Sequence, residues 1–102
     1  MTKKHSDTQR YRKIGHNLKP VVIIGAKGVT PGVIEETSRA LSDHELIKIK
    51  LPAVRKAMKT HLIEQLCSQC EAEMVHCIGN MVLLLKENPK PNPKLSNLIR
   101  PQ

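Results

Sequence analysis

The 102-residue chain is long enough for one domain with a buried core and too short for two. Its 17 lysines and arginines outnumber the 9 aspartates and glutamates, which leaves a formal net charge of +8. That balance predicts a polyanionic partner. No apolar run approaches the roughly 20 residues that a bilayer span needs, so we expect nucleic acid rather than a membrane.

The surplus charge lies at the two ends of the sequence. Residues 1–30 hold seven basic and one acidic residue, residues 89–102 hold three basic and none, and the span between is nearly neutral. The start lacks the apolar segment of a secretory signal, and three cysteines are an odd number for a disulfide framework. Both features lead us to expect a cytoplasmic protein.

Residues 7–18 predict a short basic helix with a narrow apolar stripe, formed by Tyr11, Ile14, Gly15 and Leu18. Its other faces carry basic side chains, namely Arg10, Arg12, Lys13 and His16, and Lys19 follows. The chain has no Trp or Phe, so stacking of bases on exposed aromatic rings is not expected. Contact with nucleic acid is therefore expected to use phosphates, shape and the edges of bases.

Residues 20–24 are an apolar run without alternation, which predicts a strand buried on both faces. The loop Gly25-Ala26-Lys27-Gly28 follows, and Thr30 then caps a helix expected over residues 31–43 with Pro31 at its first position. Glycines let backbone N–H groups approach a phosphate, and the helix dipole adds partial positive charge. This order of elements predicts an anion site at the loop.

The second half predicts a strand over residues 44–51, a helix over 54–70 and two strands over 74–78 and 81–86. A period of two places Lys48 and Lys50 on one face of the first strand, and Gly79-Asn80 suits the turn of a hairpin. The element order is α-β-α-β-α-β-β. Residues 87–102 are rich in proline and lysine, so we expect an extended or disordered basic tail beside a domain over residues 1–86.

The chain resembles the CRM domain family, whose bacterial single-domain members are YhbY-type RNA-binding proteins. The resemblance covers about residues 5–86 and rests on the ordered motifs Gln9-Arg10, Gly15-His16, Leu18-Lys19-Pro20-Val21, Ile24-Gly25 with Gly28, Val33 with Glu36, Ala40-Leu41, His44-Glu45-Leu46-Ile47-Lys48, Ala72-Glu73 and Ile78-Gly79.

The resemblance implies an α/β domain with a four-stranded mixed sheet and packed helices, similar to the C-terminal domain of a translation initiation factor. It also implies binding of structured ribosomal RNA in large-subunit assembly, with no catalysis and no cofactor. The chain departs from the family pattern at Ala26, where a basic residue is frequent, at Glu71, where a helix-ending glycine is usual, and at Leu85, where an aromatic residue is common.

We therefore expect a monomer that binds RNA through the basic helix and the GxxG loop. The expected contact residues are Arg10, Arg12, Lys13, His16, Lys19, Gly25, Ala26, Lys27, Gly28 and Thr30. Lys27 would neutralise a phosphate that the loop N–H groups bind. Replacing Gly25 and Gly28 by Asp is expected to weaken RNA binding severely.

Two alternatives stay open. Charge alone does not separate an RNA-binding protein from a nonspecific DNA-binding or nucleoid-type protein. Cys67, Cys70 and Cys77 with His76 could bind zinc or make a thiol-dependent regulator, but their positions in a helix and a strand favour ordinary packing. No Ser, His and Asp set and no converging pair of carboxylates supports an enzyme.

Overall fold

The computed structural model describes the backbone of residues 5–98 and the side chains of residues 8–98. Seven elements follow in the predicted order, and their bounds are α1 His5–His16, β1 Pro20–Ile23, α2 Pro31–His44, β2 Leu46–Lys50, α3 Lys56–Cys70, β3 Glu73–Ile78 and β4 Met81–Leu85. The mixed α/β class and the four-stranded sheet are confirmed. No helix in the described part of the chain is long and apolar enough to cross a membrane.

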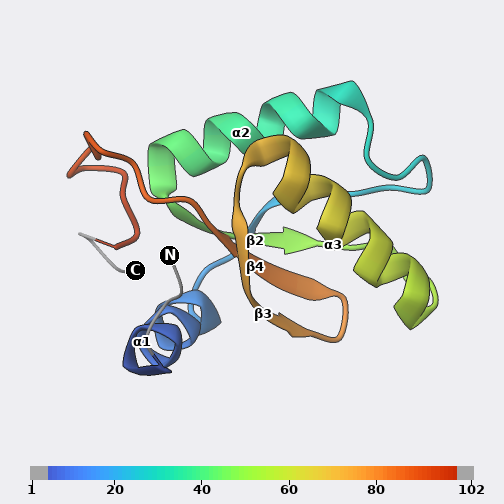
Figure 1. Ribbon diagram of the computed structural model, residues 1–102, viewed down its shortest axis with the longest axis horizontal. Coiled ribbons are helices and arrows are strands. Elements are labelled where there is room, and N and C mark those ends of the chain that lie inside the picture. Colours follow the sequence, from blue (N-terminus) through green and yellow to red (C-terminus); the bar gives the residue numbers. More distant parts are fainter. Residues whose placement is uncertain (1–4, 99–102) are drawn as a thin grey trace.

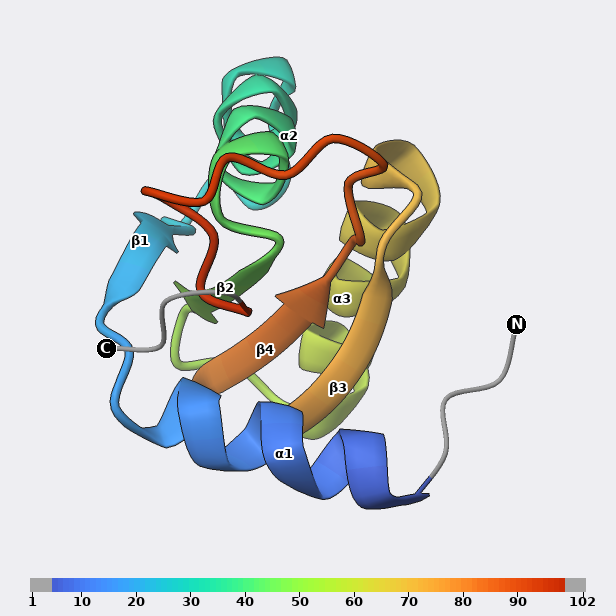
Figure 2. The same cartoon turned by 90° about the vertical axis from the view of Figure 1, so that its left-hand side faces the viewer.

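The sheet has the strand order β1-β2-β4-β3. β1 runs parallel to β2, which the crossover through α2 permits, and the other two pairs are antiparallel. α1 packs on one face of the sheet, whereas α2 and α3 cover the other face (Figures 1 and 2). The molecule is thus a three-layer arrangement with unequal outer layers.

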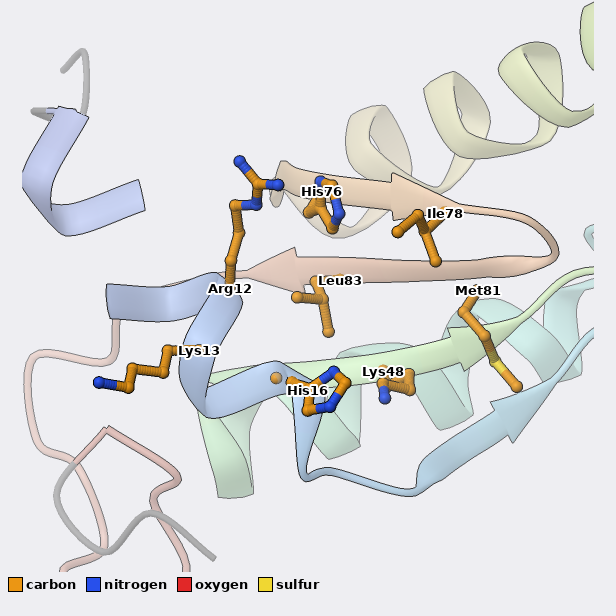
Figure 3. Close-up of a pocket in the computed structure, with 9 residues that line it drawn as sticks. Arg12, Lys13, His16, Lys48, His76, Ile78, Met81 and Leu83 are labelled. Atoms are coloured by element: carbon orange, nitrogen blue, oxygen red, sulfur yellow. The ribbon is translucent and has the colours of Figure 1, made fainter. Parts of the chain in front are cut away.

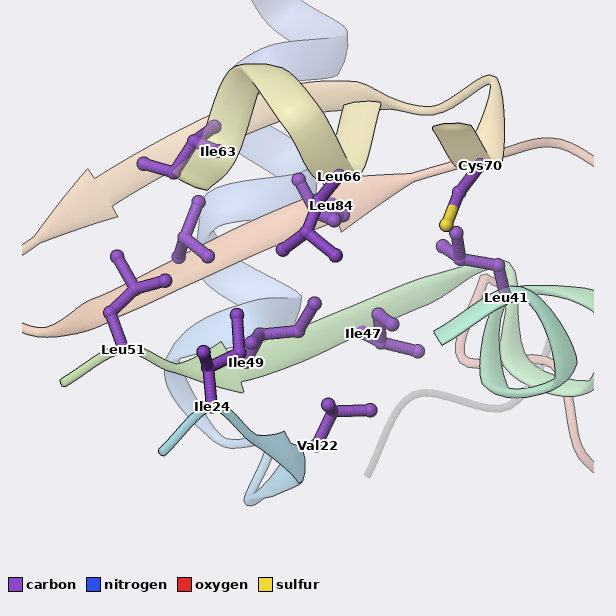
Figure 4. Packing of buried hydrophobic residues seen from close by; sticks show 11 residues of the cluster. Val22, Ile24, Leu41, Ile47, Ile49, Leu51, Ile63, Leu66, Cys70 and Leu84 are labelled. Atoms are coloured by element: carbon purple, nitrogen blue, oxygen red, sulfur yellow. The ribbon is translucent and has the colours of Figure 1, made fainter. Parts of the chain in front are cut away.

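The larger core lies between the sheet and the pair α2 and α3 (Figure 4). Alternate strand residues such as Ile47, Ile49 and Leu84 point into it and meet Leu41 and Leu66 from the two helices. All five are at most 1% exposed. Burial of this apolar layer holds the sheet in place, and α1 packs against the other face of the sheet.

α1 approaches the sheet closely at Gly15. A Cβ at this position would lie 2.3 Å from Leu83 Cδ1, so a side chain here would force Leu83 to move. The predicted apolar stripe of the helix is confirmed, because Tyr11, Ile14 and Leu18 are buried in a second, smaller cluster with Leu46, Leu83 and Leu85. The basic side chains of α1 are thereby held outward.

The expectation that residues 20–24 are buried on both faces is wrong. β1 is an edge strand, and α1 packs on β2 and β3 rather than over it. Val22 and Ile24 point into the larger core, whereas Val21 and Ile23 are 47% and 66% exposed. The apolar run reads as fully buried because every side chain is β-branched or proline, although only one face is covered.

The C-terminal segment is also more ordered than its composition suggests. Residues 87–98 contain no helix or strand, yet Ser96 and Asn97 are buried. The amide of Asn97 donates to the Leu46 carbonyl at 2.7 Å, and its backbone N–H donates to the His44 carbonyl at 2.9 Å. The segment runs back along the end of the sheet beside α2 (Figure 2). The expectation that this stretch would not pack is corrected for residues 87–98, whereas residues 99–102 lie outside the described part.

Candidate nucleic-acid interface

Three of the expected contact residues, Arg12, Lys13 and His16, lie on α1 beside an open cavity of about 390 Å³. Lys48 of β2 and His76 of β3 line the same cavity. Figure 3 shows Arg12 extending towards His76, while Lys13 points away from them. The apolar floor comes from Leu83, Met81 and Ile78. Helix and sheet thus bring together basic groups that are far apart in the sequence.

The lining of this cavity has one sign of charge. Arg12, Lys13 and Lys48 carry positive charge, and none of the described residues that line the cavity is acidic. The opposite face is mixed, because α2 and α3 carry the acidic side chains of Glu35, Glu36, Asp43 and Glu64. The α1 face is therefore the positive face of the domain, which favours contact with a polyanion.

His76 is half-buried at the edge of this cavity. Partial desolvation, with a further contribution from the Arg12 guanidinium, lowers the pKa of its imidazole below the ordinary value. Both causes oppose a positive charge on the ring. The lowered pKa favours the neutral imidazole, which can both donate and accept a hydrogen bond.

The loop between β1 and α2 is a tight turn. Gly28 has a φ of +73°, and its N–H donates to the Gly25 carbonyl at 3.0 Å. This turn bond uses one of the N–H groups that the anion-site prediction assigned to a phosphate. Ala26 and Lys27 lie exposed at the tip, and a Cβ at Gly25 would meet nothing within 4 Å. Gly28 is required by the backbone, whereas packing places no demand on Gly25.

Thr30 caps α2 as predicted. Its hydroxyl accepts a hydrogen bond from the Val33 N–H at 3.2 Å, and its carbonyl accepts one from the Ile34 N–H at 3.0 Å. Because Pro31 has no N–H, only Gly32 among the first three helical residues keeps an N–H that these contacts do not use. The anion site expected at this helix end is therefore smaller than the sequence suggests, and Thr30 has a structural role.

The remaining basic candidates lie apart from the cavity. Arg10 donates to the Leu98 carbonyl at 2.9 Å, and its guanidinium lies 5.8 Å from the centre of the Tyr11 ring. Arg10 therefore helps to hold the C-terminal segment. Lys19 lies beside a smaller hollow of about 240 Å³ that Lys48 also lines.

The loop and α1 lie at opposite ends of the sheet (Figure 1), and the lysines of β2 lie between them. Lys48 pairs with Pro20, and Lys50 pairs with Ile23 just before the loop. Strand alternation places both lysines on the α1 side of the sheet, the side to which Leu46 also points. The structure thus connects the two predicted contact regions through residues that the site prediction omitted.

Lys48, Lys50 and His76 are the additions that the structure makes to the predicted site. The alternation of residues 44–51 places both lysines on one face, but the sequence does not say which strand lies beside them. His76 follows a register irregularity in β3 between Met74 and His76. Such a bulge has no clear sequence signal here, so the face to which His76 points could not be predicted.

The cysteines occupy different environments. Cys70 is buried in the larger core, and the Ser38 hydroxyl donates to its sulfur at 3.4 Å. Burial, followed by the neighbouring groups of Cys70 and Glu73, raises the pKa of the Cys67 thiol above its ordinary value, which disfavours the reactive thiolate. Among the residues that the structure describes, no three histidine, cysteine or acidic side chains converge as a set of metal ligands.

Comparison with known proteins identifies the family. Residues 3–86 match the CRS1/YhbY (CRM) domain. This protein belongs to the CRM domain family. The predicted resemblance is therefore confirmed over most of the chain.

Relatives of this CRM domain include a probable RNA-binding protein of Pseudomonas aeruginosa, 46% identical over 92 residues that cover 90% of this chain and 88% of the relative. A Haemophilus influenzae RNA-binding protein is 35% identical and covers 76% of this chain and 79% of its own length. The solution structure of a hypothetical Staphylococcus aureus protein, a candidate RNA-binding protein, has a TM-score of 0.76 at 26% identity, covering 87% of this chain and 93% of that one. These relatives are named for RNA binding rather than for a reaction.

Proposed function

We propose that this CRM domain protein binds structured RNA through the α1 face of its sheet and the Gly25–Gly28 loop. The observation that carries the proposal is the cation-lined cavity between α1, β2 and β3, where no side chain among residues 8–98 contributes a carboxylate. Lys48 and Lys50 extend this positive surface towards the loop. The names of the relatives agree with RNA as the polyanion.

In this proposal the basic side chains contact different phosphates along the surface. Arg12 and Lys48 neutralise phosphates beside the cavity, and Lys27 does so at the exposed loop tip. The bare backbone at Gly25 lets the sugar-phosphate chain approach closely, because a side chain there would stand in open space. Each neutralised phosphate releases counterions, so the binding constant falls steeply as salt rises.

The proposed target is large-subunit ribosomal RNA or its precursor, and the binding form is a monomer. The target follows from the family resemblance, in which single-domain members are linked to assembly of the large subunit. The supporting feature of this chain is the basic lining of its α1 face, which suits binding to a large RNA.

Gly25→Asp tests the loop contact. The backbone and the packing around Gly25 tolerate a side chain, whereas the positive φ of Gly28 makes a substitution there strained. We expect the Gly25→Asp protein to remain folded and to bind a large-subunit ribosomal RNA fragment roughly tenfold more weakly, since an added carboxylate repels the phosphate. Fluorescence anisotropy over a salt series gives the dissociation constants.

Ser68→Asp, at an exposed position on α3, is the matched control with the same change in charge. It is expected to bind within twofold of the wild type. If both variants bound the RNA fragment more weakly by the same factor, the loop contact would be rejected. Equal affinity of the wild type for a DNA duplex and for the RNA would instead favour a nonspecific DNA-binding protein.

Sedimentation tests the ribosomal target separately. The tagged protein is expected to migrate with large-subunit precursor particles in a sucrose gradient and to leave them at high salt. Migration with small-subunit particles, or only as free protein at low salt, would contradict the assignment to the large subunit while leaving RNA binding intact.

A further inference from the structure

We propose that the cavity between α1 and the sheet receives one unpaired nucleotide of the bound RNA, with its base on the apolar floor and its phosphates at the basic rim. This inference rests on the proposed function, because it specifies which part of an RNA the α1 face holds. The cavity volume of about 390 Å³ falls within the range of pockets that hold small ligands.

The floor of the cavity favours a base over a bare phosphate. It is formed by the side chains of Leu83, Met81 and Ile78, and Ile78 is 66% exposed although it is a large apolar residue. A phosphate gains nothing from such a surface, whereas a flat base can bury it. The bases of a duplex are stacked inside the helix and cannot reach it, so the occupant must be unpaired.

The rim supplies flat polar groups in a chain that lacks exposed aromatic residues. Tyr11 is the only residue among Phe, Trp and Tyr, and it is 5% exposed in the smaller core. His16, His76 and the Arg12 guanidinium are planar, and all three line the cavity. Imidazole and guanidinium planes stack on unpaired bases in RNA-binding proteins. In this proposal the stacking groups are therefore imidazole and guanidinium planes, and not the rings of Phe, Trp or Tyr.

Charge distinguishes the proposed occupant from a protein segment. Among the residues that the structure describes, the charged or titratable groups around the cavity are all basic, namely Arg12, Lys13, His16, Lys48 and His76. Arg12 and Lys48 lie on opposite sides of the opening in Figure 3, one on the helix and one on the central strand. Within an RNA chain, the sugar of each nucleotide is flanked by two phosphates. Arg12 and Lys48 can therefore each neutralise one phosphate while the base lies between them.

Two RNA hairpins with the same stem provide the test. One is fully paired, and the other carries a single unpaired 2-aminopurine nucleotide in the stem. The wild-type protein is expected to bind the bulged hairpin roughly tenfold more tightly, as stacking of one base would give. The fluorescence of 2-aminopurine is expected to change on binding.

The double variant His16→Ala, His76→Ala removes the imidazoles, and Ile78→Ser removes part of the floor at an exposed position. Each is expected to lose the preference for the bulge, and Ile78→Ser, which changes no charge, is expected to keep its affinity for the paired hairpin within twofold. Gly25→Asp is expected to weaken both hairpins and to keep the preference. Thermal unfolding by circular dichroism verifies that each variant is folded.

Equal binding of the two hairpins by the wild type would overturn the nucleotide pocket and leave the proposed RNA binding standing. Binding of neither hairpin and of no ribosomal RNA fragment would overturn the proposed function as well. Displacement of the bulged hairpin by a polyglutamate peptide of the same charge would identify the cavity as a general anion site and would also overturn the nucleotide assignment.

Discussion

At the scale of single residues, two glutamates adopt positive φ angles at helix ends, and only one is held there by its side chain. Glu45 follows α2 with a φ of +63°, and its carboxylate accepts hydrogen bonds from the Ser96 hydroxyl at 2.6 Å and the Asn88 N–H at 2.7 Å. Glu71 follows α3 with a φ of +54°, and its side chain is exposed. The sequence pattern marked this second position as one where glycine is usual, and the left-handed backbone explains why.

Glu71→Gly is expected to raise the free energy of unfolding by about 1 kcal/mol, because glycine adopts this conformation without a Cβ penalty. Glu71→Ala removes the same charge and keeps the Cβ, so it is expected to leave the stability nearly unchanged. Urea unfolding followed by circular dichroism compares the two. A gain for alanine as large as that for glycine would show that charge, and not backbone strain, limits the stability here.

At the scale of elements, local patterns predicted most of the fold. Thr30-Pro31 marks the start of α2, and Gly79-Asn80 marks the hairpin turn, because both depend on neighbouring residues alone. The exposure of Val21 and Ile23 could not be predicted, since it depends on how far α1 reaches across the sheet. Among site residues, Arg12, Lys13 and His16 share one helix and were found together, whereas Lys48 and His76 join them only through strand pairing.

The C-terminal segment also shows that local sequence patterns do not predict long-range contacts. Its composition predicts no core of its own, and residues 87–98 indeed form no helix or strand. Its contacts are with distant parts of the chain, among them a buried carboxylate, and no local pattern reveals them. Glu45 lies in a sequence motif of the family resemblance, but its partners Asn88 and Ser96 are more than 40 residues away.

Glu45→Gln is expected to lower the free energy of unfolding by about 2 kcal/mol, because an amide nitrogen cannot accept one of the two hydrogen bonds that the buried carboxylate accepts. Faster hydrogen exchange at the Asn88 and Asn97 amides, measured by NMR, is expected to accompany the loss. Glu64→Gln, on the exposed face of α3, is the matched control and is expected to change neither quantity. Unchanged exchange at Asn88 in the Glu45→Gln protein would show that the carboxylate does not hold the segment.

At the scale of the whole molecule, the fold separates charge between two faces of one sheet. α2 and α3 fill the larger core and carry acidic as well as basic side chains outward. α1 covers only part of the other face and leaves Lys48 beside its own basic residues, with Lys50 farther along β2 towards the loop. The net charge of +8 predicts a polyanion without saying where it binds, and the sheet topology is the basis of the location that we propose.

The most direct test is a charge reversal on each face of the sheet, with the same change in net charge in both variants. Arg12→Glu with Lys13→Glu reverses two cations on α1, and Arg39→Glu with Lys56→Glu reverses two exposed cations on α2 and α3. The affinity of both variants for a large-subunit ribosomal RNA fragment is measured over the same salt series. We expect the α1 variant to bind the RNA roughly a hundredfold more weakly and with a smaller salt slope. The other variant is expected to bind within threefold of the wild type. Equal losses would mean that overall charge, and not the α1 face, binds the RNA.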